Sequence, residues 1–447
     1  MRNNIISHLN KISKIFDKRN KSENYFLIIR NASWLTLDRI IRLGGSALIG
    51  VLITRYLGPE KFGILSYTTA LPNLFLAFTG LGMDQIAVRE LVRNEKPQNS
   101  ILGTAFSIRG LGGIVSLLIA LVSVSIFTGN DQFIFLLVLI SSFKFLFLSF
   151  DVIDFWFQSQ TASKYPIIAR NTAFIVVSVL KIFLLFLKAP LIYFVIITAV
   201  EFIFASIALV IIYKIKGNKI FEWKFDFTLA KSLLKEGFPL MIAALAASVY
   251  YNIDQIVIGN YFSKTEVGFY SAALRLSEIW YFIPVAFYSS VFPLMTKLKD
   301  ENEKLFFRRF SAIASILFWI SFVFAIVMSF SSGFLINIIY GNRFSVSAQI
   351  LSVHIWSCVF IFVGIAVSIW TMVNGFQYIT LISCLTGAVI NIILDVVLVP
   401  VYKGVGAAYA TIIAYSVANY FVYFLIPKSR RIIILVTKSI INPWKYS

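Results

Sequence analysis

The sequence is poor in charged residues and nearly free of the residues that build metal centres and disulfides. Charged residues make up 14% of the 447 positions, whereas a soluble domain carries about 25%. The two histidines, His8 and His354, lie in no ligand cluster, so we expect no metal site. The two cysteines, Cys358 and Cys384, lie in apolar stretches, which favours small core residues over a disulfide. These scarcities exclude an ordinary cytosolic enzyme.

Motifs of nucleotide and acyl chemistry are also missing. The sequence contains no G-x-x-x-x-G-K-[ST] loop and no G-x-S-x-G elbow, so it predicts neither a Walker-type nucleotide site nor a hydrolase nucleophile. Asp151 and Asp154 are three residues apart and could form a catalytic pair, but their place near the end of an apolar span favours a polar helix terminus. We therefore expect no enzyme activity and no cofactor. Energy for any transport must come from an ion gradient or from the substrate gradient.

Long apolar runs dominate the chain instead. Hydrophobic residues make up 59% of it, and the mean hydropathy is +0.83, which excludes disorder. A membrane-spanning helix needs about 20 mostly apolar residues. We predict an all-α polytopic membrane protein with twelve transmembrane helices, at residues 32–57, 62–83, 101–128, 132–157, 165–187, 190–213, 238–262, 267–295, 310–332, 346–372, 376–399 and 404–427.

The basic residues are distributed unevenly between the predicted loops. The chain has 40 Lys and Arg against 21 Asp and Glu. This excess lies between apolar runs rather than over a polar surface, which argues against a nucleic-acid partner. The loops on the side of the N-terminus carry 27 Lys and Arg, and the opposite loops carry five. Because basic loops stay inside the cell, both termini are predicted to be cytoplasmic.

The two halves of the chain repeat a pattern at equivalent places. Residues 55–58 align with 260–263, so that Tyr56 matches Tyr261, and residues 62–66 align with 267–271. Because six spans is an even number, the repeats would be parallel, with a pseudo-two-fold axis along the membrane normal and a cavity between them. The predicted parts are a basic cytoplasmic N-terminal segment (1–30), an N-terminal six-helix lobe (31–213), a cytoplasmic linker (214–237), a C-terminal six-helix lobe (238–427) and a basic cytoplasmic tail (428–447).

Charged residues inside the predicted spans are the main sign of a functional site. Each costs roughly 2.5–3.5 kcal/mol at the centre of a membrane helix, so it should face a bundle interior or a hydrated cavity. Arginine suits phosphate because its planar fork donates two parallel hydrogen bonds. We predict that five arginines bind a phosphate-bearing substrate in the central cavity: Arg39, Arg42, Arg109, Arg170 and Arg275. Four acidic residues are candidates for ion coupling or charge pairing: Asp38, Asp254, Glu278 and Asp395.

Local explanations compete with this functional one. Asp38 and Arg42 are four residues apart, and Arg275 and Glu278 are three apart, spacings at which neighbours on a helix form ion pairs. Lys181 lies near a span end, from which its side chain could reach water. The number of such charges in the first, third, fifth, seventh and eighth spans favours a hydrated cavity.

The chain resembles the polysaccharide flippases of the O-antigen type, within the multidrug/oligosaccharidyl-lipid/polysaccharide exporter superfamily. The resemblance covers about residues 25–430. Its most specific part is the turn between the first two spans, residues 55–60. The other matching positions are Asn31, Phe62-Gly63, Tyr67, Gly80-Leu81-Gly82, Arg89-Glu90, Gly268-Phe269-Tyr270 with Arg275, Asn391, Pro400, residues 404–408 and Thr411.

This resemblance implies a flippase that moves an undecaprenyl-diphosphate-linked oligosaccharide (an O-antigen, capsule or exopolysaccharide precursor) across the cytoplasmic membrane of a bacterium or archaeon. It implies two lobes that open alternately, with cavity arginines in the first and eighth helices, which Arg39 or Arg42 and Arg275 match by placement. The implied partners are the lipid-linked glycan, the bilayer, H⁺ or Na⁺, and the polysaccharide polymerase machinery.

Two alternatives stay open. A multidrug exporter of the same superfamily would need a cavity dominated by carboxylates, whereas here the basic residues match or exceed them. A membrane-embedded glycan polymerase or ligase would be expected to carry a sizeable outer loop, but the predicted outer connections are short.

Overall fold

The computed structural model describes residue 38 and residues 41–129 and 131–442, and this part of the chain is helical without any strand. Nine of its helices are long and apolar enough to cross a membrane, and a tenth span results if the bent pair Ile41–Asn73 and Leu76–Arg93 is counted as one. Large apolar side chains such as Leu48, Ile126 and Phe330 are exposed along these helices. Exposure of this kind is typical of a surface that faces lipid.

Two of the long helices contain a sharp break, which explains why twelve spans were predicted. Gln377–Leu425 has 49 residues, or about 70 Å of helix, more than twice the thickness of a bilayer core. Lys403, with a φ of 54°, interrupts it. Gly58, with a φ of 70°, interrupts Ile41–Asn73 in the same way, and only glycine adopts this conformation without strain. Counting each side of the two breaks separately gives twelve spans in the described residues.

The helix ends follow from local sequence signals. Asp131, Asp226 and Asn302 accept hydrogen bonds from backbone N–H groups at the starts of their helices, which satisfies donors that have no partner within the helix. The remaining bounds are α2 Leu76–Gly80, α3 Asp84–Arg93, α4 Gln98–Thr128, α5 Gln132–Ser142, α6 Lys144–Phe147, η1 Leu148–Asp151, α7 Val152–Ser159, α8 Lys164–Phe186, α9 Leu191–Ile215, η2 Ile220–Glu222, α10 Phe227–Tyr261, α11 Lys264–Glu278, η3 Ile279–Tyr281, α12 Phe282–Glu301, α13 Glu303–Ile339, η4 Asn342–Phe344, α14 Val346–His354, α15 Ser357–Val373, α16 Gln377–Ser416, η5 Val417–Phe421, α17 Val422–Leu425 and α18 Pro427–Ile441.

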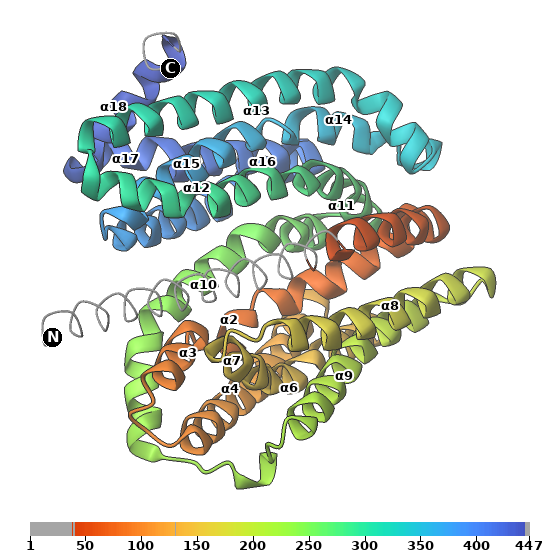
Figure 1. Cartoon of the computed structure of the whole chain (residues 1–447). Helices are drawn as coiled ribbons and strands as arrows, with labels where there is room; N and C mark the ends of the chain where they lie inside the picture. Colours follow the sequence, from red (N-terminus) through yellow and green to blue (C-terminus); the bar gives the residue numbers. More distant parts are fainter. Residues whose placement is uncertain (1–37, 39–40, 130, 443–447) are drawn as a thin grey trace, which may run out of the picture.

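The helices gather into two groups (Figure 1). Helices α3 to α9 form one group, α12 to α18 form the other, and α10, α11 and the helix Ile41–Asn73 lie between them. The start of α10 packs on the first group, since Leu229, Ala230 and Leu233 belong to the same buried cluster as residues of α3, α4 and α7. The helix that contains the predicted seventh span (238–262) therefore begins earlier, at Phe227, and its first turns pack on the first group.

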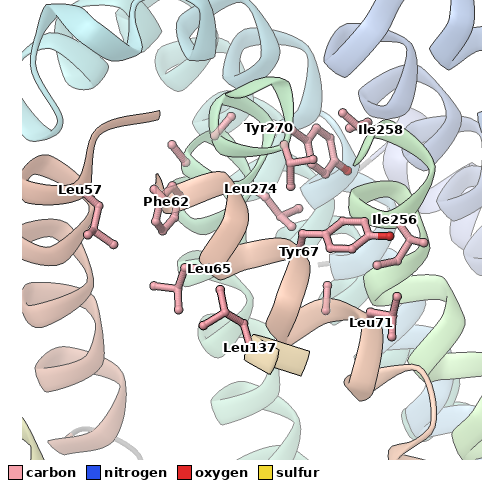
Figure 2. Packing of buried hydrophobic residues seen from close by; sticks show 14 of the residues in the cluster. Leu57, Phe62, Leu65, Tyr67, Leu71, Leu137, Ile256, Ile258, Tyr270 and Leu274 are labelled. Carbon is pink, nitrogen blue, oxygen red and sulfur yellow. The ribbon is translucent and has the colours of Figure 1, made fainter. Parts of the chain in front are cut away.

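One buried apolar cluster joins the two groups. It contains Leu57, Phe62 and Tyr67 from the helix Ile41–Asn73, and Ile258 and Tyr270 from α10 and α11. Figure 2 shows these side chains converging from the two halves of the chain. The Tyr67 hydroxyl also donates a hydrogen bond to Asn260 Oδ1 at 3.0 Å. The molecule is thus closed at the end that carries the Gly58 turn.

The closest approach within this closed end is reciprocal between the two repeats. A Cβ atom added to Gly63 would lie 1.6 Å from the Lys264 carbonyl oxygen, and one added to Gly268 would lie 1.9 Å from the Pro59 carbonyl oxygen. Gly63 matches Gly268 in the repeat alignment, and Pro59 matches Lys264. A reciprocal contact between equivalent residues is what a two-fold relation between the lobes predicts. Glycine is required at both positions because the backbones touch.

Candidate functional site

A cavity of about 520 Å³ lies between the two halves of the chain; it is called the central cavity below. The first half contributes side chains of Ile41–Asn73, α8 and α9, and the second half contributes α11 and Tyr340. Most of the lining is apolar, and three charged side chains, Lys181, Arg275 and Glu278, line it as well. A mostly apolar pocket with a few polar groups is typical of a site that binds and orients a ligand.

Arg275 is the predicted arginine that fits a substrate site best. It lines the central cavity, and within the described residues no carboxylate lies within 4 Å of its guanidinium. Its CZ atom lies 4.8 Å from the centre of the Phe62 ring, a cation–π contact that orients the guanidinium without neutralising it. An unpaired cation in a largely apolar cavity is costly unless an anion binds there.

Glu278 also lines the central cavity, one helical turn from Arg275. The two side chains do not form an ion pair in the structure, so this local explanation for their presence is wrong. The other proposed local pair is confirmed, since Arg42 Nε donates to Asp38 Oδ1 at 3.0 Å. Arg39 lies outside the described residues.

Arg42 faces a second cavity, of about 360 Å³, which is called the Arg42 cavity. Asp38, Asp151, Arg170 and Glu201 also line it. The guanidinium carbon of Arg42 lies 5.7 Å from the Phe174 ring centre, and Phe174 lines the central cavity. The two cavities are therefore neighbours.

Arg170 and Arg109 belong to a network of ion pairs inside the first lobe. Arg170 lies 2.8 Å from Asp151 and 3.0 Å from Asp154, and it lines both the Arg42 cavity and a third cavity of about 320 Å³ beside Asp84. Arg109 is 4% exposed, pairs with Asp84 and donates to the Leu148 carbonyl oxygen at 3.1 Å. Arg109 lines none of these three cavities, so its charge holds carboxylates in place.

Asp254 and Asp395 lie together in a buried polar cluster of the second lobe. Asn391 Nδ2 donates to Asp254 Oδ1 at 3.1 Å and to Asp395 Oδ2 at 3.4 Å, and Thr411 Oγ1 lies 2.8 Å from Asp254 Oδ2. Tyr270 donates its hydroxyl to the same oxygen of Asp254. All five side chains are at most 5% exposed. The cluster offers carboxylate, amide and hydroxyl oxygens, the donors that hard cations prefer.

Two oxygens of this cluster have no partner. Asn391 Oδ1 and Asp395 Oδ1 are buried and receive no hydrogen bond in the described part of the chain. Buried acceptors without partners are rare and call for a bound ion, a proton or a water. The sequence pointed to Asp254 and Asp395 but not to their neighbours, because α11 and α16 meet α10 only in the folded chain.

The sequence matches the polysaccharide biosynthesis protein family over residues 28–299. The chain belongs to this family. Two curated relatives from Haloferax volcanii are similar to it: a probable low-salt glycan biosynthesis flippase, Agl15, with 25% identity over 43% of this chain, and a probable flippase, AglR, with 26% identity over 40%. The alignments cover 41% and 38% of those proteins, so the chain matches about two fifths of the length of these relatives.

Solved structures show the same fold. The chain superposes on the inward closed conformation of the lipid II flippase MurJ with a TM-score of 0.69, 18% identity and coverage of 92% of this chain and 91% of that one. It superposes on an inward-facing multidrug resistance MATE transporter of the MOP superfamily with a TM-score of 0.67, 14% identity and coverage of 92% and 99%. These superpositions confirm the predicted fold of this protein, with twelve helices in two lobes.

Proposed function

We propose that this protein is a flippase that moves an oligosaccharide linked to a polyprenyl diphosphate, such as undecaprenyl diphosphate, across the cytoplasmic membrane. The observation that carries the proposal is Arg275, whose guanidinium faces a cavity of about 520 Å³ between the lobes and has no carboxylate partner among the described residues. The two curated relatives are named as a probable low-salt glycan biosynthesis flippase and a probable flippase, which supports transport rather than enzyme catalysis.

The chemistry of the cargo explains why such a cavity is needed. A diphosphate and a glycan lose their hydration on entering hydrocarbon, which is prohibitive without replacement partners. Arg275 replaces water around the phosphate, while hydroxyl groups such as those of Ser46, Thr69 and Ser178 in the cavity lining serve sugar hydroxyls. The polyprenyl chain stays in the lipid. Arg42 and Arg170 line the neighbouring Arg42 cavity, where their ion pairs with carboxylates form a polar surface for the sugars. Arg109 positions the carboxylates Asp84 and Asp151.

The closed end at Gly58 supports a proposal of alternating access. The lobes touch there through the backbones of Gly63 and Gly268 and through the buried apolar cluster that contains Phe62, Tyr67 and Tyr270. Separation of this contact would open the central cavity to the other side of the membrane. With the basic loops inside, as the sequence predicts, the closed end faces outward and both termini are cytoplasmic.

The Asp254 cluster is proposed as the coupling site for H⁺ or Na⁺. Its two unpartnered oxygens would be satisfied by a bound cation or by a proton. Asp38 and Glu278 are assigned differently, since Asp38 is paired with Arg42 and Glu278 faces the substrate cavity. After translocation, the glycan would be available to polysaccharide polymerase machinery on the outer face.

The fold alone does not distinguish this function from multidrug export, because a MATE transporter shares it. The charges favour the glycan. Asp151 and Asp154 pair with Arg170, and Glu201 pairs with Lys181, so these carboxylates are already neutralised. An organic cation would need a cavity dominated by free carboxylates. The central cavity has one carboxylate, Glu278, against two cations, Lys181 and Arg275, among its lining residues in the described part of the chain, a balance that suits an anion.

The test is a flipping assay in liposomes with a fluorescent undecaprenyl-diphosphate-linked oligosaccharide. Arg275→Ala should reduce the initial flipping rate at least tenfold, because the phosphate loses its charged partner, and Arg275→Lys should restore part of it. Arg93→Ala is the matched control, since Arg93 is exposed and pairs only with Glu90. Normal flipping by folded Arg275→Ala protein would refute the proposal.

A further inference from the structure

We infer that Lys181 is the second phosphate-binding cation and that Glu201 is its resting counterion, which the diphosphate of the cargo displaces. This inference rests on the proposed function and adds a residue that the sequence placed at a span end. In the structure, the Lys181 side chain is only 15% exposed and lines the central cavity, so it points into the protein rather than toward water.

Lys181 and Arg275 face the same cavity from opposite lobes. Lys181 lies on α8 and Arg275 on α11, and both side chains line the central cavity, where two like charges repel each other. A polyprenyl diphosphate linked to a sugar carries about two negative charges on adjacent phosphates. Two cations that face one cavity match this pair of charges, and the anion removes their repulsion. Bound diphosphate would therefore bridge the lobes.

Without cargo, Glu201 holds Lys181 loosely. The distance from Lys181 Nζ to Glu201 Oε2 is 3.5 Å, longer than the usual 2.7–2.9 Å of a charge-assisted hydrogen bond. A lysine on a flexible four-carbon stem can turn from one anion to another. The exchange keeps Lys181 neutralised in both states, and it leaves Glu201 facing the Arg42 cavity, which Arg42 and Arg170 also line.

The pair also lies between two cavities. Lys181 lines the central cavity, whereas Glu201 lines the Arg42 cavity. When the phosphate takes Lys181, the ion pair that links the linings of these two cavities is lost, and we expect the glycan attached to the phosphate to enter the polar Arg42 cavity. Binding of the diphosphate is thereby coupled to access of the sugars to the Arg42 cavity.

Substitutions of Lys181 and of Glu201 should change the affinity for the diphosphate in opposite directions. An ion pair with a purely structural role would not show this difference. The experiment measures the Kd of undecaprenyl diphosphate and of undecaprenyl monophosphate for the full-length protein in nanodiscs. Lys181→Met should weaken binding of the diphosphate about tenfold and of the monophosphate much less. Glu201→Gln should tighten diphosphate binding about threefold, because it removes the competing anion.

Lys144→Met is the matched control. Lys144 is also a lysine of the first lobe held inside the protein, where it donates to Asn73, but it lines none of the three cavities, so this variant should leave both Kd values unchanged. If Lys181→Met does not fold, as judged by thermal unfolding, Lys181→Gln replaces it with the same expectations, because its amide can still bond to Glu201.

Equal weakening by Lys181→Met and Glu201→Gln, or no change from either, would overturn the inference. The Kd values of Arg275→Ala, measured in the same experiment, distinguish a failure of this inference from a failure of the proposed function. If Arg275→Ala weakens binding while the Lys181 variants do not, only the role of Lys181 fails. If Arg275→Ala also binds normally, the proposed function fails with it.

Discussion

At the scale of single residues, the two arginines Arg109 and Arg275 have different roles although their side chains are the same. Arg109 and Arg275 are both arginines within predicted spans, but Arg109 is enclosed by Asp84 and a backbone carbonyl, whereas Arg275 faces a cavity without a carboxylate partner. A buried ion pair contributes little net stability, since desolvation offsets the attraction. An unpaired cation in a cavity is different, because its cost is recovered only when an anion binds.

The buried carboxylate Asp254 gives a prediction at this scale. Asp254→Asn removes the charge that would hold a coupling cation or proton, so stimulation of flipping by a Na⁺ or H⁺ gradient should fall at least tenfold. The measurement is the flipping rate in liposomes with and without each imposed gradient.

Asp300→Asn is the control for this experiment, because Asp300 is an exposed carboxylate on the last turns of α12. The assignment of the coupling site is wrong if Asp254→Asn responds to the gradient as the unchanged protein does.

At the scale of elements, the break at Gly58 determines how the first two spans are used. It divides the segment Ile41–Asn73 into two helices at an angle to each other. Figure 2 shows Leu57 on the helix before the break and Phe62 on the helix after it. On the helix after the break, Gly63 contacts the start of α11. The repeat alignment of Gly63 with Gly268 could be made from the sequence, but their mutual contact could not, because it depends on how the two lobes pack.

The Gly63 contact predicts that a single methyl group shifts the conformational equilibrium. In Gly63→Ala, the added Cβ would lie 1.6 Å from the Lys264 carbonyl oxygen, so the Gly58 end cannot close as it does here. A cysteine introduced at Ala70, which is 3% exposed in the apolar cluster at this end, should react with a water-soluble maleimide about tenfold faster in this background. The parent protein for labelling carries Cys384→Ser.

Gly333→Ala is the matched control, because a Cβ at Gly333 meets no atom within 4 Å and should leave the labelling rate unchanged. Equal labelling rates in the Gly63→Ala and parent proteins would show that this contact does not control closure.

At the scale of the whole molecule, the membrane is part of the solvent that selects the fold. The long helices expose apolar side chains outward and enclose their charges, the arrangement that hydrocarbon imposes on a helical protein. The uneven distribution of basic loops then predicts the orientation. Lys61, beside the closed end, should face outward, and Lys219, between α9 and α10, should face the cytoplasm.

Orientation is tested by labelling cysteines at these two exposed positions in whole cells, again in the Cys384→Ser background. An impermeant maleimide should label Lys61→Cys in intact cells, and Lys219→Cys only after the membrane is permeabilised. The reverse result would invert the predicted topology and place the closed end inside.

The helical class, the twelve predicted spans and the correspondence between Gly63 and Gly268 could be predicted from the sequence, because they depend on apolar length and on local patterns. It could not determine which charges are free. Whether Arg109 meets Asp84, or Lys181 meets Glu201, depends on the rotation and lateral packing of helices fixed by distant contacts, such as that of Tyr67 with Asn260. That Arg275 and Lys181 face one cavity is visible only in the folded chain, since no local spacing in the sequence relates α8 to α11.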